Sequence, residues 1–245
     1  MVETNKSDSN STTEIISNSL KRNGFHSKYL SICKSKNLLP LPEVKVKQRN
    51  VHVLDFHCDR IKPQDWLSIC SSLHNDGSLQ FLAIRLRKNM DLGIIQVILM
   101  VEYLIRSLFV MLVLEEIDNL KKTNSVKTRP VILTKYLFTE LVDTLQKFLH
   151  SNSVLRTVIC EGLPLTGKYM ISFSKGLANN HSIKTLSLAR SIIGDEGCEI
   201  VCSTVKHLPN IETLDFSHCN LSVKGAESIT NLIKVKHAND INLYN

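Results

Sequence analysis

The chain has 245 residues, of which 43% are hydrophobic and 22% charged, an ordinary composition for one substantial globular domain. Seven cysteines without regular spacing exclude a disulfide framework and favour reduced core residues, and the opening MVETNKSDSNSTTE lacks the features of a secretory signal. The default compartment is therefore the cytoplasm. The net charge of +7 arises within residues 21–50, where eight Lys or Arg stand against Glu43 alone. We interpret this basic segment as a solvated cap rather than a binding site for nucleic acid.

Residues 1–25 are rich in Ser, Asn and Thr, and we expect a disordered tail there. Residues 26–50 follow as an expected N-terminal cap. Tyr29, Leu30 and Cys33 have helical spacing, and Pro40 and Pro42 then favour an extended segment. The open core of a repeat array needs such a cover at its end.

One sequence pattern occurs twice between residues 183 and 233. Ile183, Leu186, Leu188, Ile193, Gly197, Cys198, Val201 and Val205 recur at one constant offset as Ile211, Leu214, Phe216, Leu221, Gly225, Ala226, Ile229 and Ile233. This offset, about 28 residues, lies within the range of periods found in leucine-rich repeats. The first half of each copy alternates like a strand, and the second half has the spacing of a short helix. We therefore predict a leucine-rich-repeat solenoid, which is an α/β horseshoe with an inner parallel sheet and outer helices.

The same register predicts about six repeats, with starts at 51, 79, 127, 155, 183 and 211. We assign 51–87 and 127–245 to repeats. The unit at 127 keeps its helix half, but its strand half holds only Ile132 and contains Pro130. After Ile233 a further unit begins without completing, so we expect the front part of a longer protein or a short isoform.

The interval from 79 to 127 exceeds the period by more than half, and we assign 88–126 to an apolar helical insert and loop. Its run Leu92–Leu114 could span a bilayer by length. Glu102 and Arg106 lie within it, however, and a charge at a helix centre costs several kcal/mol there, about 3 on insertion scales. A helix packed on the solenoid is the preferred interpretation. A membrane-anchored adaptor that uses 92–114 remains the alternative, and so does an anomaly of the gene model.

Three motifs suggest chemistry but have simpler explanations. Gly162–Lys168 fits GxxxxGK, but Tyr169 stands where a phosphate loop needs Ser or Thr, and Leu165 is a core position. Cys198 and Cys202 suggest zinc, yet the register directs this helix face to the core. The run Asp55, His57, Asp59 has the alternation of an exposed strand face, with no nucleophile beside it. We predict no catalytic residue, metal or cofactor.

The strand residues that point away from the core are the functional candidates, because they line up between repeats and curved repeat surfaces bind proteins. The predicted partner-binding residues are Asp55, His57, Phe81, Arg85, Thr157, Ile159, Glu161, Thr185, Ser187, Thr213, Asp215 and Ser217. Phe81 and Arg85 are the preferred anchors, since aromatic and Arg side chains dominate binding hot spots.

The period and the helix in each unit are similar to the ribonuclease-inhibitor class of leucine-rich repeat. Segments including KYLSICKSKNLLPLPEV, VLDFHCDRIKPQDW and RPVILTKYLFTELVDTLQKFL resemble the amino-terminal half of the seventy-eight-kilodalton centrosomal protein family. The similarity covers most of 28–235, although the apolar insert has no counterpart in the family pattern. The resemblance implies a non-enzymatic scaffold at the centrosome, centriole and cilium basal body. Centriolar proteins and components of a ubiquitin ligase would be its partners, with a role in cilium assembly.

Overall fold

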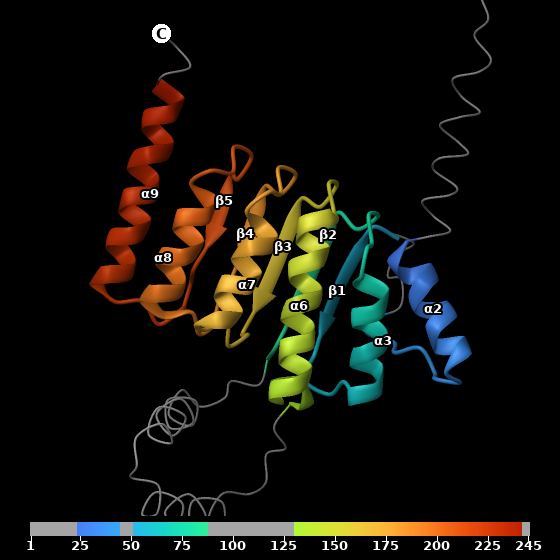
Figure 1. Ribbon diagram of the computed structural model, residues 1–245. Helices are drawn as coiled ribbons and strands as arrows, with labels where there is room; N and C mark the ends of the chain where they lie inside the picture. The colour runs from blue at the N-terminus through green and yellow to red at the C-terminus, as the bar shows by residue number, and fades with distance from the viewer. Residues whose placement is uncertain (1–23, 45–50, 88–129, 242–245) are drawn as a thin grey trace, which may run out of the picture.

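A computed structural model describes residues 24–44, 51–87 and 130–241, with side chains up to residue 236. Within these ranges five strands form one parallel sheet whose spatial order follows the sequence: β1 (Val53–His57), β2 (Phe81–Arg85), β3 (Thr157–Glu161), β4 (Thr185–Ser187) and β5 (Thr213–Asp215). Figure 1 shows the helices as a second layer on one face of this sheet. The predicted fold, a solenoid with a parallel sheet on one side and helices on the other, is confirmed.

The helices stack in a row, each packed against the next. Their bounds are α2 (Phe25–Ser35), α3 (Pro63–Leu73), η1 (Val131–Leu133), α6 (Lys135–Ser151), α7 (Lys168–Leu177), α8 (Gly194–Val205) and α9 (Val223–Ile241). α2 covers the first end by packing on α3, and Tyr29 there is 1% exposed. The backbone N–H of Leu41 donates to the Tyr29 hydroxyl over 3.1 Å, which joins the LPLP segment to this helix. The predicted tail at 1–25 lies outside the described residues except for residues 24 and 25, and the predicted insert at 88–126 lies wholly outside them.

The second repeat differs from the prediction in one respect. Facing residues of β4 and β5, Ser187 and Asp215, are 28 residues apart in the sequence, whereas 76 residues separate Arg85 on β2 from Glu161 on β3. β2 nevertheless pairs directly with β3, so no strand lies between them. Residues 131–133 form the 3-10 helix η1, and α6 packs between α3 and α7. The starts at 79 and 127 therefore belong to one repeat, which has its strand before the extra residues and its helix after them.

Alternate strand residues and one face of each helix build the core between the two layers. In the strands these are Leu54, Phe56, Leu82, Ile84, Val158, Cys160 and Leu186, each at most 1% exposed. Trp66 is the largest side chain there, and its ring lies 5.9 Å from that of Phe56. All seven cysteines are free and buried, as the sequence predicts for core cysteines.

A ladder of buried amide and carboxylate groups joins the repeats just before the strands. Asn180 is 3% exposed; its amide nitrogen donates to the carbonyls of Leu149 and Asn152, and its oxygen accepts from the backbone N–H groups of Ser182 and Ile183. Asn152 repeats this arrangement one unit earlier, donating to the carbonyls of Asp76 and Leu79. These side chains satisfy backbone groups that the turn leaves without partners.

Candidate functional site: the concave sheet face

The strand residues on the sheet face opposite the helices form three rows across the repeats, which we call the concave face. The first row is Val53, Phe81, Thr157, Thr185 and Thr213; the second is Asp55, Ala83, Ile159, Ser187 and Asp215; the third begins with His57, Arg85 and Glu161, and Ser217 follows β5. The parallel register therefore brings the predicted residues together on one surface. Whether they bind a partner stays a prediction.

Two small residues of this face contribute little surface. Ala83 is fully buried and Ser187 is 8% exposed, whereas Phe81, Thr157 and Ile159 are half-buried. Larger side chains on the adjoining strands cover these small ones, because neighbouring strands in a sheet lie only about 5 Å apart. The apolar surface that a partner can contact therefore lies mainly at Phe81 on β2 and Ile159 on β3.

Arg85 joins three strands at the carboxyl end of the face. Its Nε donates to Asp55 Oδ1 on β1 over 2.9 Å, its Nη2 to Asp55 Oδ2 over 3.4 Å, and its Nη1 to Glu161 Oε2 on β3 over 2.8 Å. Hydrogen bonding to Asp55 raises the pKa of Arg85 above its ordinary value. A guanidinium has five N–H donors, so two remain free for another group. The predicted anchor thus also holds two carboxylates in place.

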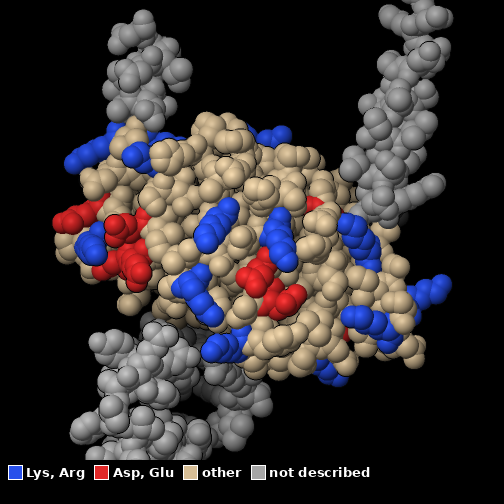
Figure 2. All heavy atoms as spheres, in the orientation of Figure 1, with Lys and Arg blue, Asp and Glu red and all other residues tan. Residues whose placement is uncertain are grey.

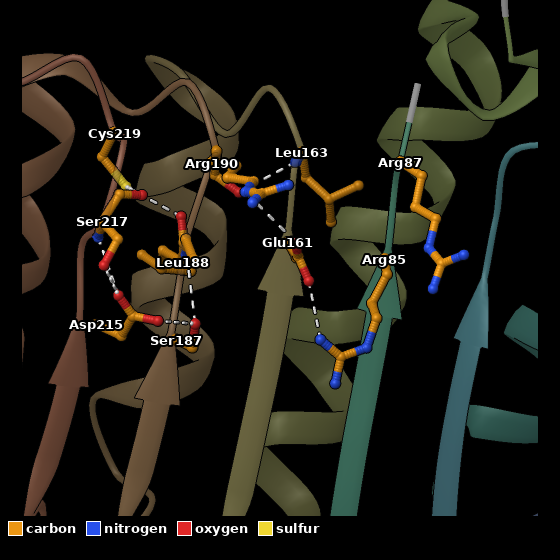
Figure 3. A network of polar contacts seen from close by, with 12 residues as sticks. Arg85, Arg87, Glu161, Leu163, Ser187, Leu188, Arg190, Asp215, Ser217 and Cys219 are labelled. Carbon is orange, nitrogen blue, oxygen red and sulfur yellow. Dashed lines mark hydrogen bonds and ion pairs between the residues drawn. The ribbon is translucent and has the colours of Figure 1, made fainter. Parts of the chain in front are cut away.

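A second polar cluster lies at the other end of the face, around β4 and β5. Asp215 Oδ2 accepts from the Ser187 hydroxyl over 2.8 Å, and its Oδ1 accepts from the Ser217 hydroxyl and backbone N–H (Figure 3). The hydrogen bond from the Ser217 hydroxyl lowers the pKa of Asp215 below its ordinary value. Asp215 therefore adds a negative charge to the concave face on the β5 side of Arg190.

Arg87 and Arg190 belong to the site although the strand pattern does not predict them. Figure 3 shows both side chains at the carboxyl ends of the strands, with Arg190 directed toward Glu161. Arg190 Nε lies 3.9 Å from Glu161 Oε1, and its side chain is 61% exposed. These residues line a hollow of about 650 Å³, together with Asp55, His57, Arg85 and Glu161. The Nδ1 atom of His57 is buried there and has no hydrogen-bond partner among the described residues.

The GxxxxGK segment is a turn between β3 and α7. Gly162 has φ +73°, and a Cβ atom there would lie 2.4 Å from the Leu86 carbonyl oxygen, so glycine is required by the backbone. Leu165 is fully buried, as predicted. The Lys168 Nζ atom lies 5.1 Å above the Tyr169 ring. The fold therefore accounts for these residues without a phosphate.

The Cys198 and Cys202 sulfur atoms lie 3.9 Å apart inside the core, where the repeat register placed this helix face. Across the described ranges, no group of three or more His, Cys, Asp or Glu side chains is arranged to hold a metal ion. No helix in those same ranges is long and apolar enough to cross a membrane. The run Leu92–Leu114, on which the membrane alternative depends, lies outside them.

The helix face carries mixed charge. Figure 2 shows Lys and Arg side chains scattered among acidic ones, with acidic side chains gathered over α8 and α9. Several apolar side chains are also exposed on this layer, among them Tyr136 at 68% on α6 and Ile171 at 44% on α7. They offer a matched control surface for experiments on the concave face.

The leucine-rich-repeat family matches residues 179–202 and 207–229. The chain is 34% identical to a Drosophila melanogaster protein named Protein Cep78 homolog over 227 residues, which is 92% of this chain and 25% of that protein. It is 30% identical to the Mus musculus Centrosomal protein of 78 kDa over 211 residues, 86% of this chain and 24% of that protein. A solved structure of the actin-binding site 2 of leiomodin-1 matches with a TM-score of 0.44 and 10% identity, covering 80% of this chain and 87% of that one. The chain spans about a quarter of the length of the curated relatives it matches, and it belongs to the centrosomal protein of 78 kDa family.

Proposed function

We propose that this chain is a non-enzymatic leucine-rich-repeat module that binds other proteins at the centrosome through its concave face. The observation that carries the proposal is the three-row ladder across five strands, on which half-buried apolar residues lie beside ordered charged groups. Curved repeat surfaces of this kind bind proteins by extended contact. The relatives named as centrosomal proteins support the place of action.

The family resemblance extends the proposal further. Centriolar and basal-body proteins, and components of a ubiquitin ligase, are the proposed partners, and cilium assembly is the proposed process. Nucleic acid is not a proposed partner, because the basic residues of 21–50 accompany no recognition motif. A membrane is the disfavoured alternative, because Glu102 and Arg106 interrupt the apolar run 92–114.

Imaging of the tagged chain beside a centriole marker tests the proposal. Phe81→Ala with Ile159→Ala removes apolar surface from the concave face, and Tyr136→Ala with Ile171→Ala removes it from the helix face. We expect the first pair to reduce centrosomal accumulation and the second pair to leave it unchanged, while both variants keep the circular dichroism spectrum of the parent. If the parent chain fails to accumulate at centrosomes, the proposed place is wrong. If both pairs behave alike, the concave face is not the binding surface.

A further inference from the structure

The hollow at the carboxyl ends of β1, β2 and β3 contains more arginine than its own acids can satisfy. Arg85 alone engages both carboxylates, at 2.9 Å to Asp55 and 2.8 Å to Glu161. Arg190 lies 3.9 Å from Glu161, beyond hydrogen-bond distance, with a mostly exposed side chain. The guanidinium of Arg87 makes no ion pair with either of these two carboxylates, and its backbone N–H donates to Asp59 Oδ2 over 3.1 Å. Arg190 therefore has one long ion pair with Glu161, and Arg87 has none with the two carboxylates that line the hollow.

The charge of the hollow defines the ligand that fits it. The three guanidinium groups and two carboxylates that line the hollow leave an excess of one positive charge among the Arg, Asp and Glu side chains. One carboxylate group would balance this excess and could accept hydrogen bonds from Arg87, Arg190 and the free donors of Arg85. A phosphate with a charge near −2 would exceed the excess and would face Asp55 and Glu161 at short range. The hollow is therefore matched to a monoanion.

Apolar surface continues from the hollow toward the start of the strands. Ile159 stands two residues before Glu161 on β3, and Phe81 begins the neighbouring strand; both are half-buried. A protein segment that placed a carboxylate in the hollow would bring its neighbouring side chain over these residues. Aromatic and arginine side chains are the usual anchors of such contacts.

We propose that this hollow binds the carboxylate of a Glu or Asp in an acidic segment of a protein partner, with an apolar neighbour of that residue on Phe81 and Ile159. The proposal rests on the protein-binding role of the concave face and adds the chemistry of the partner. Arg87 and Arg190 hold the anion from the two sides. Arg85, which Asp55 and Glu161 keep in place, limits how deeply the anion enters the hollow.

Capped glycine–serine peptides with a central Leu-Ser-Glu, Leu-Ser-Gln or Leu-Ser-phosphoserine test this site on the full chain. The readout is the Nε–Hε nuclear magnetic resonance signal of each arginine during titration. We expect the Glu peptide to shift Arg87 and Arg190 saturably and the Gln peptide to leave them unshifted. Arg87→Gln with Arg190→Gln should weaken binding about tenfold, as for the loss of charge-assisted hydrogen bonds.

Lys147→Gln with Lys175→Gln removes the same charge from exposed positions on the helix face and should leave binding unchanged. Equal weakening in both variants, equal binding of the Glu and Gln peptides, or tighter binding of the phosphoserine peptide would each overturn the proposal. If centrosomal accumulation still depends on Phe81 and Ile159 in that case, the carboxylate site is wrong while the protein-binding role stands.

Discussion

Replacing Asn180 with alanine should destabilise the solenoid severely, because this amide satisfies backbone groups of two neighbouring repeats. Its removal leaves the carbonyls of Leu149 and Asn152 and the N–H groups of Ser182 and Ile183 without these partners. A buried polar group left unsatisfied costs about 1–3 kcal/mol, and water can reach part of this site because Asn180 borders a polar hollow. We expect a loss of about 3 kcal/mol in the free energy of unfolding.

Urea unfolding followed by circular dichroism measures this loss, provided that the slope of the transition stays constant. Asn179→Ala is the matched control, since this neighbouring asparagine is exposed, and a loss below about 0.5 kcal/mol is expected for it. Asn180→Asp should be at least as harmful as alanine, because a carboxylate cannot donate to the two carbonyls it would face. Asp76→Asn should be mild, because Asp76 only accepts hydrogen bonds. Unfolding of Asn180→Ala and Asn179→Ala at the same urea concentration would show that the Asn180 amide does not stabilise the solenoid.

Three further predictions concern single groups. Hydrogen bonds from the Ser222 hydroxyl and N–H lower the pKa of Asp195, so its contribution to stability is present above about pH 4 and is lost as the pH falls through the lowered pKa. The melting temperature of Asp195→Asn should therefore depend less on pH in that acidic range, and parallel curves would contradict this. Burial raises the pKa of Cys160 to about 12, so alkylation at neutral pH, read by mass spectrometry, should reach it only after unfolding; rapid labelling of the folded chain would refute this. Gly162→Ala should cost about 2–4 kcal/mol because of the backbone contact described above, whereas Gly167→Ala, with open space around it, should cost about 1 kcal/mol in urea unfolding; equal losses would exclude the contact as the cause.

The fold could be predicted from the sequence because two periods coincide, alternation within each strand and a constant spacing from one repeat to the next. The prediction of a separate repeat starting at 127 was wrong, although its helix half forms α6. Its strand half had only Ile132 and contained Pro130, which has no N–H for a sheet. The correct strand lies before the extra residues, and periodicity cannot show this, because it records spacing along the chain and not which strand is the neighbour in space.

The rows of the concave face were equally predictable, but Arg87 and Arg190 were not. Both follow the ends of their strands, where the backbone conformation of the turn decides where a side chain points. Gly162, Arg190 and His218 occupy the same position in three successive repeats, and all three are left-handed, with φ +73°, +58° and +57°. A glycine at that position in one repeat therefore indicates a left-handed backbone at the corresponding residue of the next repeat.

The second repeat shows why a solenoid tolerates extra residues at this point. Between β1 and α3 the chain needs only residues 58–62, whereas residues 86–134 separate the end of β2 at Arg85 from the start of α6 at Lys135. For a connection about ten times longer, closure costs only about 2 kcal/mol more in chain entropy. Burial of apolar side chains on β2 and α6 offsets this cost, because each buried side chain stabilises the fold by about 1.5–3 kcal/mol. These side chains are Leu82, Ile84, Leu141, Leu145 and Leu149. The backbone N–H of Leu86 also donates to the Glu161 carbonyl, which holds the end of β2 against β3. Packing between neighbours therefore preserves the sheet register, and with it the arginine hollow, whatever the length of chain between strand and helix.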